Sequence, residues 1–310
     1  MMRDELPGLV KVGPRVIQTD AEFAHLQSMR AASSTPWYVD TASPTSLTEG
    51  RLAMNAVAQA FPEFFHQART LDSRAVGYAV TVPGYWGGGA QALPNLHYYL
   101  HHLRFAYRQM LSLGLAHRCA QAMPWTGGAF RRMAASLREE RLRGANAIVM
   151  VGIAIDPEYA RLPLSSLFFD AVKRSAKSLG LRHIIAPFRP SGYGQFKALK
   201  NATHSAELFK EYCAMRGLDG LAADPWLRSV ARHGVEFLRT EPRSYQIERP
   251  LMSFERLRHT FKPDSWYSPE PDVWECGETP TWYVDRGRGM VISVEPNLWG
   301  KLRWDPASAG

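Results

Sequence analysis

One segment, residues 147–187, constrains the fold of this chain more than any other. Residues 147–155 form a continuous apolar run that ends at an Asp-Pro turn signal, and this pattern predicts a buried strand. From Leu164 the apolar residues recur at helical spacing until Gly180, which predicts an amphipathic helix ended by a glycine. Residues 181–187 predict a second strand. A strand, a helix and a strand in this order predict two strands of one sheet joined by a helical crossover.

The loop before the predicted helix lies where an anion is favoured. Free backbone amides and the positive end of the helix dipole attract phosphate groups at the amino end of a helix. Pro163 stands in this loop, and because proline has no N–H, one donor is missing there. The amides of Leu164, Ser165 and Ser166 remain to hold a pyrophosphate. In the alternative interpretation Pro163 is only a favourable first-turn residue, at a position where the missing N–H costs little.

The same segment resembles the acetyl-CoA segment of the GNAT superfamily of N-acetyltransferases, in particular its larger members. The residues that carry the resemblance are Asp156-Pro157-x-Tyr159, Leu164-Ser165-Ser166, 180–183 and Ala186-Pro187-x-Arg189-Pro190. Further matches follow in the same order along the chain, at 76–83, 93–94, 224–228 and 291–299. Residues 75–83 are also predicted to form a strand. One residue departs from the family pattern: Pro163 takes the place of a loop glycine.

The resemblance implies an α/β (α+β) GNAT fold, with a mixed, mostly antiparallel twisted sheet, a splayed central strand pair, flanking helices and extra N- and C-terminal segments. It also implies direct transfer of an acyl group, acetyl in the first place, from acetyl-CoA or another acyl-CoA to an amine of a small molecule, without a metal. By resemblance, the backbone of Ile153, Ala154 and Ile155 lies along the pantetheine arm. The residues that would meet the CoA phosphates are Arg161, Leu162, Leu164, Ser165 and Ser166.

The catalytic residues are less clearly marked. Tyr193 follows the second predicted strand, and a phenol there could protonate the leaving group. No glutamate stands within 147–155, so the general base of many GNAT enzymes has no counterpart in that strand. His183 is a possible substitute, although a histidine in a strand is more often structural.

Two alternative functions remain open from the sequence. The formal net charge of +8 favours an anionic partner, which CoA or tRNA would satisfy. A few GNAT-like enzymes of natural-product assembly take their acyl group from aminoacyl-tRNA, and the lost glycine and the basic charge fit that donor. The second alternative is a non-catalytic GNAT fold that acts as a binding module. Basic residues cluster at 131–143 and 239–262, where a solvated, structural role is the alternative to a tRNA surface.

The rest of the chain gives an organisation of three parts. We expect an N-terminal arm at 1–45, a GNAT-like core at 46–239 and an extension at 240–310 that completes the sheet and ends in a strand at 290–299. Residues 240–288 lack a regular pattern and are rich in Pro, Trp and Tyr, so they predict either an aromatic wall against a ligand or rings packed on the sheet.

Composition bears on compartment and metal content. No apolar window of membrane-spanning length and no signal peptide is visible, so we expect a cytoplasmic protein without membrane contact. The spacing of His97 and His101 suits a metal, but no third ligand is evident, and packing is the favoured interpretation. The sequence does not indicate the oligomeric state.

Overall fold

The computed structural model describes residues 5–6, 10–13, 19–33, 55, 58, 61–93, 95–96 and 128–305. Contacts divide the chain into two compact units. Unit 1 comprises residues 1–92, 98–184 and 304–310, and unit 2 comprises 93–97 and 185–303. The three-part division expected from the sequence stays a prediction.

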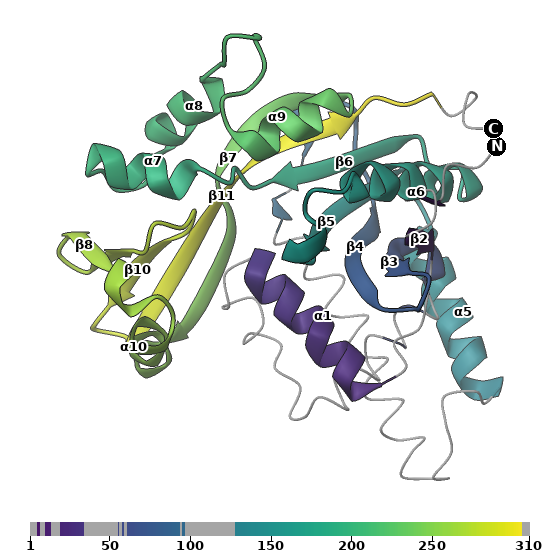
Figure 1. Ribbon diagram of the computed structural model, residues 1–310, viewed down its shortest axis with the longest axis horizontal. Helices are drawn as coiled ribbons and strands as arrows, with labels where there is room; N and C mark the ends of the chain where they lie inside the picture. The colour runs from purple at the N-terminus through teal and green to yellow at the C-terminus, as the bar shows by residue number, and fades with distance from the viewer. Residues whose placement is uncertain are drawn as a thin grey trace. The chain divides into compact units, whose positions relative to one another are not determined.

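Unit 1 contains an antiparallel sheet in the order β1-β2-β3-β4-β5 (Figure 1). Its strands are β1 (Glu5–Leu6), β2 (Val10–Gly13), β3 (Phe65–Thr70), β4 (Ala75–Gly84) and β5 (Ala147–Ile155). Its helices are α1 (Asp20–Ser33), α5 (Gly128–Leu142) and α6 (Leu164–Ser178), with 3-10 turns η1 (Pro62–Phe64), η2 (Ala90–Ala92) and η3 (Pro157–Tyr159). The strands predicted at 75–83 and 147–155 are confirmed.

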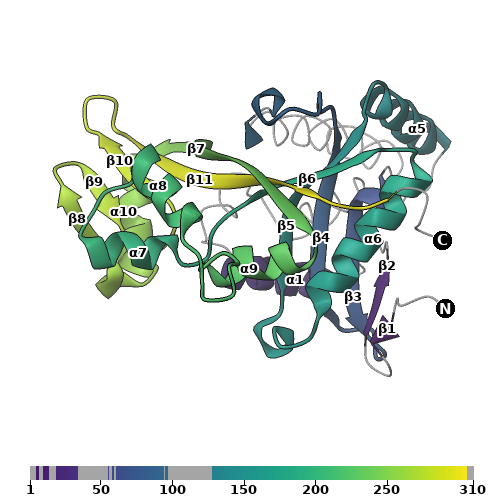
Figure 2. The same cartoon turned by 90° about the horizontal axis from the view of Figure 1, so that it is seen from above.

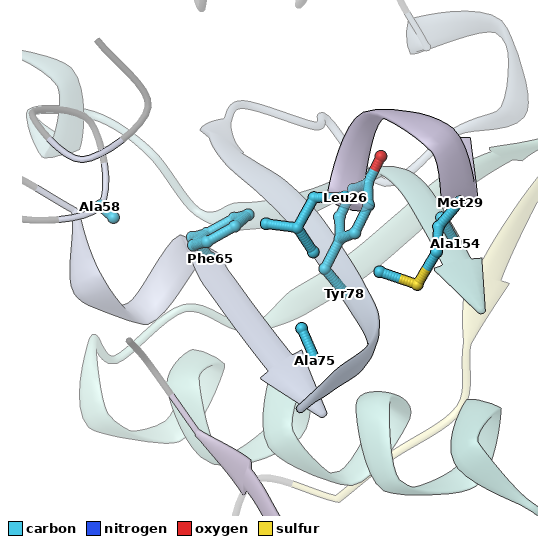
Figure 3. Close-up of a cluster of buried hydrophobic side chains, with 7 residues drawn as sticks. All are labelled: Leu26, Met29, Ala58, Phe65, Ala75, Tyr78 and Ala154. Atoms are coloured by element: carbon cyan, nitrogen blue, oxygen red, sulfur yellow. The ribbon is translucent and has the colours of Figure 1, made fainter. Parts of the chain in front are cut away.

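The sheet of unit 1 is covered by a helix on each face. Alternate residues of a strand point to opposite faces, and in β5 Ala154 joins one core while Ile153 and Ile155 pack against the other. The first core lies under Leu26 and Met29 of α1 (Figure 3). The second lies under Leu164, Leu167 and Phe168 of α6. β5, which carries the candidate site, is therefore held between two packed layers.

The predicted helix of the central segment is confirmed as α6. Its first residue follows Pro163, whose φ of −75° suits the start of a helix. Its buried stripe includes Leu164, Leu167 and Phe168, and the chain leaves the helix through Gly180 at φ +66°, a conformation that favours glycine.

Unit 2 is arranged around one long strand. β11 (Met290–Leu302) pairs antiparallel with β7 (Val235–Pro250) over almost its whole length, as Figure 2 shows. Residues 298–301 of β11 also pair with β6 (His183–Phe188), and residues 290–294 pair with β10 (Thr281–Asp285). β9 (Val273–Glu275) and β8 (Tyr267–Glu270) follow at the edge. The helices are α7 (Tyr193–Lys200), α8 (Ala206–Ala214), α9 (Pro225–Arg232) and α10 (Leu251–Thr260), with a 3-10 turn η4 (Pro263–Ser265).

The expectation that residues 240–288 are irregular is wrong, because they contain most of β7, all of α10 and three further strands. The prolines obscured β7 in the sequence. Pro242 lies where the register between β7 and β11 shifts, between the pairs Glu241↔Asn297 and Tyr245↔Glu295. A proline is tolerated at such a bulge because a ladder hydrogen bond is already missing there.

The aromatic residues of this segment pack on one another. The ring of Phe254 stacks on Trp282 at 5.3 Å and meets Trp266 edge-on at 5.6 Å, and the guanidinium of Arg258 lies 3.7 Å from the ring centre of Trp274. Phe254 and Trp282 are fully buried. The packing interpretation of the aromatic segment is confirmed for these rings.

The mixed α/β class with antiparallel strands is confirmed within each unit. The splayed central strand pair stays a prediction. Across the described ranges, no helix combines the length and apolar character that a membrane crossing requires.

Candidate functional site

The centre of the candidate site is an irregularity in β5. Its ladder with β4 pairs Gly152 with Val80 and Met150 with Thr81, so Val151 is an extra residue that bulges out of the ladder. Gly152 is exposed in the middle of the strand, and a Cβ added to it would meet nothing within 4 Å. The bulge therefore exposes a short length of backbone in an otherwise buried strand.

Residues 156–163, which we call the β5–α6 loop, lead from this strand to α6. The loop is a series of tight turns that satisfies much of its own backbone. The amide of Tyr159 donates to Asp156 O at 2.8 Å, that of Ala160 to Pro157 O at 3.3 Å and that of Leu162 to Tyr159 O at 3.0 Å. Such a loop is formed before any ligand arrives.

Of the three amides predicted to hold a pyrophosphate at the amino end of α6, two already have acceptors. The Leu164 amide donates to Leu162 O at 2.8 Å, and the Ser166 amide donates to Pro163 O at 3.1 Å. Within the described part of the chain, the amide of Ser165 has no recorded acceptor. A phosphate at this helix end would therefore take the Ser165 amide first and would share or displace the bonds of its neighbours.

Arg161 supplies the cation of the loop. Its side chain is exposed, and no carboxylate of the described residues pairs with it. Its neighbour Leu162 packs against the core beneath α6 instead, so that residue contributes backbone and apolar contact to the site. Arg161 and the end of α6 together favour an anion from solvent.

The two predicted catalytic residues belong to different units, His183 to unit 1 and Tyr193 to unit 2. The side chain of His183 meets the ring of Trp86 edge-on at 4.9 Å, and its amide donates to Asn146 O at 3.1 Å. Asn146 precedes β5, six residues before Gly152, a separation of about 20 Å along an extended strand. The structure therefore does not bring His183 to the bulge or to the β5–α6 loop.

Tyr193 is in unit 2, at the start of α7, and is fully buried. His204 Nε2 lies 2.8 Å from the carbonyl oxygen of Pro242, which can only accept, so Nε2 carries the proton. Nδ1 of His204 then accepts from the Tyr193 hydroxyl at 2.9 Å. Burial raises the pKa of Tyr193 and lowers the pKa of His204 to about 4. The role of Tyr193 as a proton donor stays a prediction, and its hydroxyl already donates to His204.

A second buried group on α7 was not predicted. The ammonium of Lys197, fully buried, donates to Glu275 at 2.5 Å, Thr281 Oγ1 at 2.9 Å and Thr279 O at 3.1 Å. Thr281 also donates to the second oxygen of Glu275 at 2.6 Å. Burial lowers the pKa of Lys197 and raises that of Glu275. Every proton of the ammonium has an acceptor, as a structural ion pair requires.

Five basic residues of the two clusters that suggested a tRNA surface pair with nearby carboxylates. In residues 131–143, Arg138 forms two bonds of 2.6 Å with Glu63, and Arg143 pairs with Glu139 at 3.4 Å. In unit 2 the pairs are Arg239–Glu241, Arg258–Glu255 and Lys262–Glu278. The solvated, structural interpretation therefore accounts for these five side chains.

The histidines at 97 and 101 lie outside the described residues. Among those described, no group of three or more His, Cys, Asp or Glu side chains is arranged to hold a metal ion. The bulge at Val151 was also missed from the sequence, although a glycine inside an apolar strand pattern is the signal that indicates one.

No family model and no curated protein matches the chain. Solved structures do match. The loading GNATL domain of CurA from Lyngbya majuscula is 10% identical, with a TM-score of 0.43 over 96% of this chain and 98% of that one. The GphF GNAT-like decarboxylase, in complex with isobutyryl-CoA, is 14% identical, with a TM-score of 0.42 over 95% and 99%. A mosquito arylalkylamine N-acetyltransferase like 5b is 15% identical, with a TM-score of 0.30 over 69% and 92%. All three names fall in the superfamily that the sequence resembles.

Proposed function

We propose that this chain is a GNAT-like acyltransferase that moves an acyl group from a CoA thioester to the amine of a small molecule. One observation carries the proposal: the bulged, exposed backbone of β5 leads through a preformed loop to a helix amino end, beside an exposed arginine that pairs with no carboxylate in the described part of the chain. Exposed strand amides suit the amides and thioester of an extended pantetheine arm, and the cationic helix end suits its phosphates.

The residues of this segment then take distinct roles. The backbone of Ile153, Ala154 and Ile155 runs along the pantetheine arm. Arg161 and the amides of Leu162, Leu164, Ser165 and Ser166 meet the diphosphate, and the Ser165 amide makes the first contact. An amide at the Val151 bulge polarises the thioester carbonyl, which stabilises the oxyanion that forms on attack.

The reaction itself is an acyl exchange without a covalent enzyme intermediate. The amine nitrogen attacks the thioester carbon, the C–N bond forms and the C–S bond breaks. The ammonium proton leaves to a base, and the thiolate of CoA takes up a proton. Holding the two substrates in line accounts for much of the rate, because it removes the entropy cost of a bimolecular encounter.

The neutralised arginines support CoA over aminoacyl-tRNA as the donor. Nucleic-acid affinity depends on cations that are free to release counterions from phosphates. Arg239, Arg258 and Lys262 already face carboxylates, whereas Arg161 does not. An unpaired cation beside one helix end matches a diphosphate better than a long polyanion.

The test is a donor assay with the purified chain and a panel of primary amines. Radiolabelled acetyl-, propionyl- and isobutyryl-CoA are offered in parallel with a mixture of charged tRNAs, with and without ribonuclease. Acyl transfer from a CoA thioester that ribonuclease leaves unchanged is the expected result. Transfer that ribonuclease abolishes would establish the tRNA-dependent alternative. If no acyl group is transferred from either donor and calorimetry detects no binding of CoA, the non-catalytic binding module is favoured.

A further inference from the structure

Asp156, the residue that ends β5, is the point at which three parts of unit 1 meet. Its side chain is buried, with 7% exposed. One oxygen, Oδ1, accepts from the Glu158 amide at 3.1 Å and so caps η3. The other, Oδ2, accepts from Arg74 at 3.1 Å and lies 3.6 Å from His25 Nε2. A carboxylate buried to this degree is stable because each oxygen has a donor.

Arg74 comes from the β3–β4 turn and holds the loop at a second point. Its guanidinium also bonds Glu158 at 2.9 Å and lies 5.7 Å from the ring centre of Tyr159. Tyr159 in turn packs against the core beneath α6. Arg74 therefore joins the first turn of the β5–α6 loop to the neighbouring hairpin.

His25 brings α1 to the same place. Its Nε2 lies 3.0 Å from Ala75 O, which can only accept, so this nitrogen carries the proton and donates it there. Asp156 Oδ2 lies 3.6 Å from the same nitrogen, a close approach without a hydrogen bond. α1 is fixed beside it by the ion pair of Glu22 with Arg69 and by Leu26, which lies in the core shown in Figure 3. α1 is thus held in place beside β5, the strand that ends at Asp156.

We propose that Asp156 is the positioning residue of the β5–α6 loop: it ties the loop to Arg74 of the neighbouring hairpin, so that Arg161 and the Ser165 amide are presented together. That these two groups meet a CoA diphosphate rests on the proposed function. The tethering of the loop does not, because it follows from contacts within the chain. Asp156 acts through the loop and touches no substrate.

A simple helix cap is the competing explanation, and two substitutions separate it from positioning. Asp156→Asn keeps an oxygen that can accept from the Glu158 amide but removes the charge that holds Arg74. Asp156→Ala removes both. Asp170→Asn is the matched control, since Asp170 is a half-exposed carboxylate of α6 that bonds only Lys173 among the described residues.

The first measurement is amide hydrogen exchange in the unliganded protein. Loss of a charged tether allows local opening, so exchange at residues 158–166 should accelerate about tenfold in Asp156→Ala and about threefold in Asp156→Asn, with β3 and β4 unchanged. The second is steady-state kinetics, in which KM for acyl-CoA rises by similar factors while kcat stays within about twofold. Asp170→Asn should match the wild type in both.

Three outcomes would overturn the proposal. In the first, exchange at 158–166 is unchanged in Asp156→Ala. In the second, exchange accelerates equally throughout β3 and β4, which indicates general destabilisation. In the third, Asp156→Asn behaves as wild type, which would mean that Asp156 only caps η3 and that its charge does not position the loop. If the wild type binds no acyl-CoA, the proposed function fails, and the exchange measurement alone still decides whether Asp156 tethers the loop.

Discussion

The two units differ in how a prominent cation of each is exposed and paired. In unit 1, Arg161 is exposed beside a helix end whose Ser165 amide bonds no acceptor among the described residues, and a bulge opens the strand before it. In unit 2, Lys197 is fully buried, and its three protons are donated to Glu275, Thr281 and the backbone. Arg161 can therefore bind an anionic ligand, whereas Lys197 has no N–H left to donate to one.

The comparison shows how an exposed charge differs from a buried, fully bonded one. A buried pair that is fully bonded specifies how elements pack, and its loss leaves an uncompensated charge. An exposed cation contributes little to stability and is free to bind an anion. Substitutions in unit 2 should therefore change folding more than ligand binding, and substitutions in the β5–α6 loop should do the reverse.

The largest effect is expected from Lys197→Ala. It leaves the Glu275 carboxylate buried without its cation, so the free energy of unfolding should fall by about 3–5 kcal/mol. The measurement is urea-induced unfolding followed by circular dichroism. The double variant Lys197→Met with Glu275→Met should recover most of this loss, because it removes both charges and keeps the volume. A loss below about 1 kcal/mol in the single variant would contradict the structural role.

The next largest effect is a pH dependence shared by both units. Burial lowers the pKa of His66 in unit 1 and of His204 in unit 2 to about 4, so both are neutral in the folded state. The unfolded chain takes up these protons near pH 6.5, so stability is complete above that pH and falls between about pH 6.5 and 4. The loss is roughly 3 kcal/mol for His66 and somewhat less for the half-buried His204.

The histidine variants assign this pH dependence to its source. Urea unfolding at pH 7.5, 6 and 5 should show a smaller loss of stability in His66→Gln and in His204→Gln than in the wild type. If the two units unfold in separate transitions, each variant should flatten only the transition of its own unit. A wild-type stability that stays constant from pH 7.5 to 5 would contradict the assignment of neutral buried imidazoles.

The same contrast explains what the sequence could and could not predict. β4, β5 and α6 were predicted because each is marked by a local pattern, an apolar run or a helical period. β11 was predicted from the resemblance of residues 291–299 to the last segment of the GNAT-like proteins. The bulge at Val151 depends on the register with β4, and only Gly152 indicates it in the sequence. Lys197 and Glu275 are 78 residues apart, and nothing local shows that they pair. β7 was missed because Pro242, at its register shift with β11, interrupts the local strand pattern.

Arg161→Ala should change CoA binding with little effect on the free energy of unfolding, the reverse of Lys197→Ala. Removing one exposed charge from a diphosphate should weaken CoA binding about fivefold to tenfold, or ~1–1.4 kcal/mol. The free energy of unfolding should change by less than about 0.5 kcal/mol. Arg182→Ala is the matched control, because Arg182 is an exposed arginine of unit 1 whose amide bonds Asn146, before the start of β5. Equal weakening by both variants would indicate nonspecific attraction by net charge.

The smallest effect, Pro163→Gly, tests the residue that departs from the family pattern. Glycine adds the missing amide at the start of α6, so CoA should bind about twofold to fivefold more tightly if the helix end holds its diphosphate. Stability should fall by about 0.4–1 kcal/mol, because Pro163 already adopts a φ of −75° and restricts the unfolded chain. Calorimetry with CoA gives the first quantity and urea unfolding the second. If stability falls and CoA affinity does not rise, Pro163 is a helix-start residue only, and the added amide does not face the diphosphate. If affinity rises, the proline limits a donor site that the fold still provides.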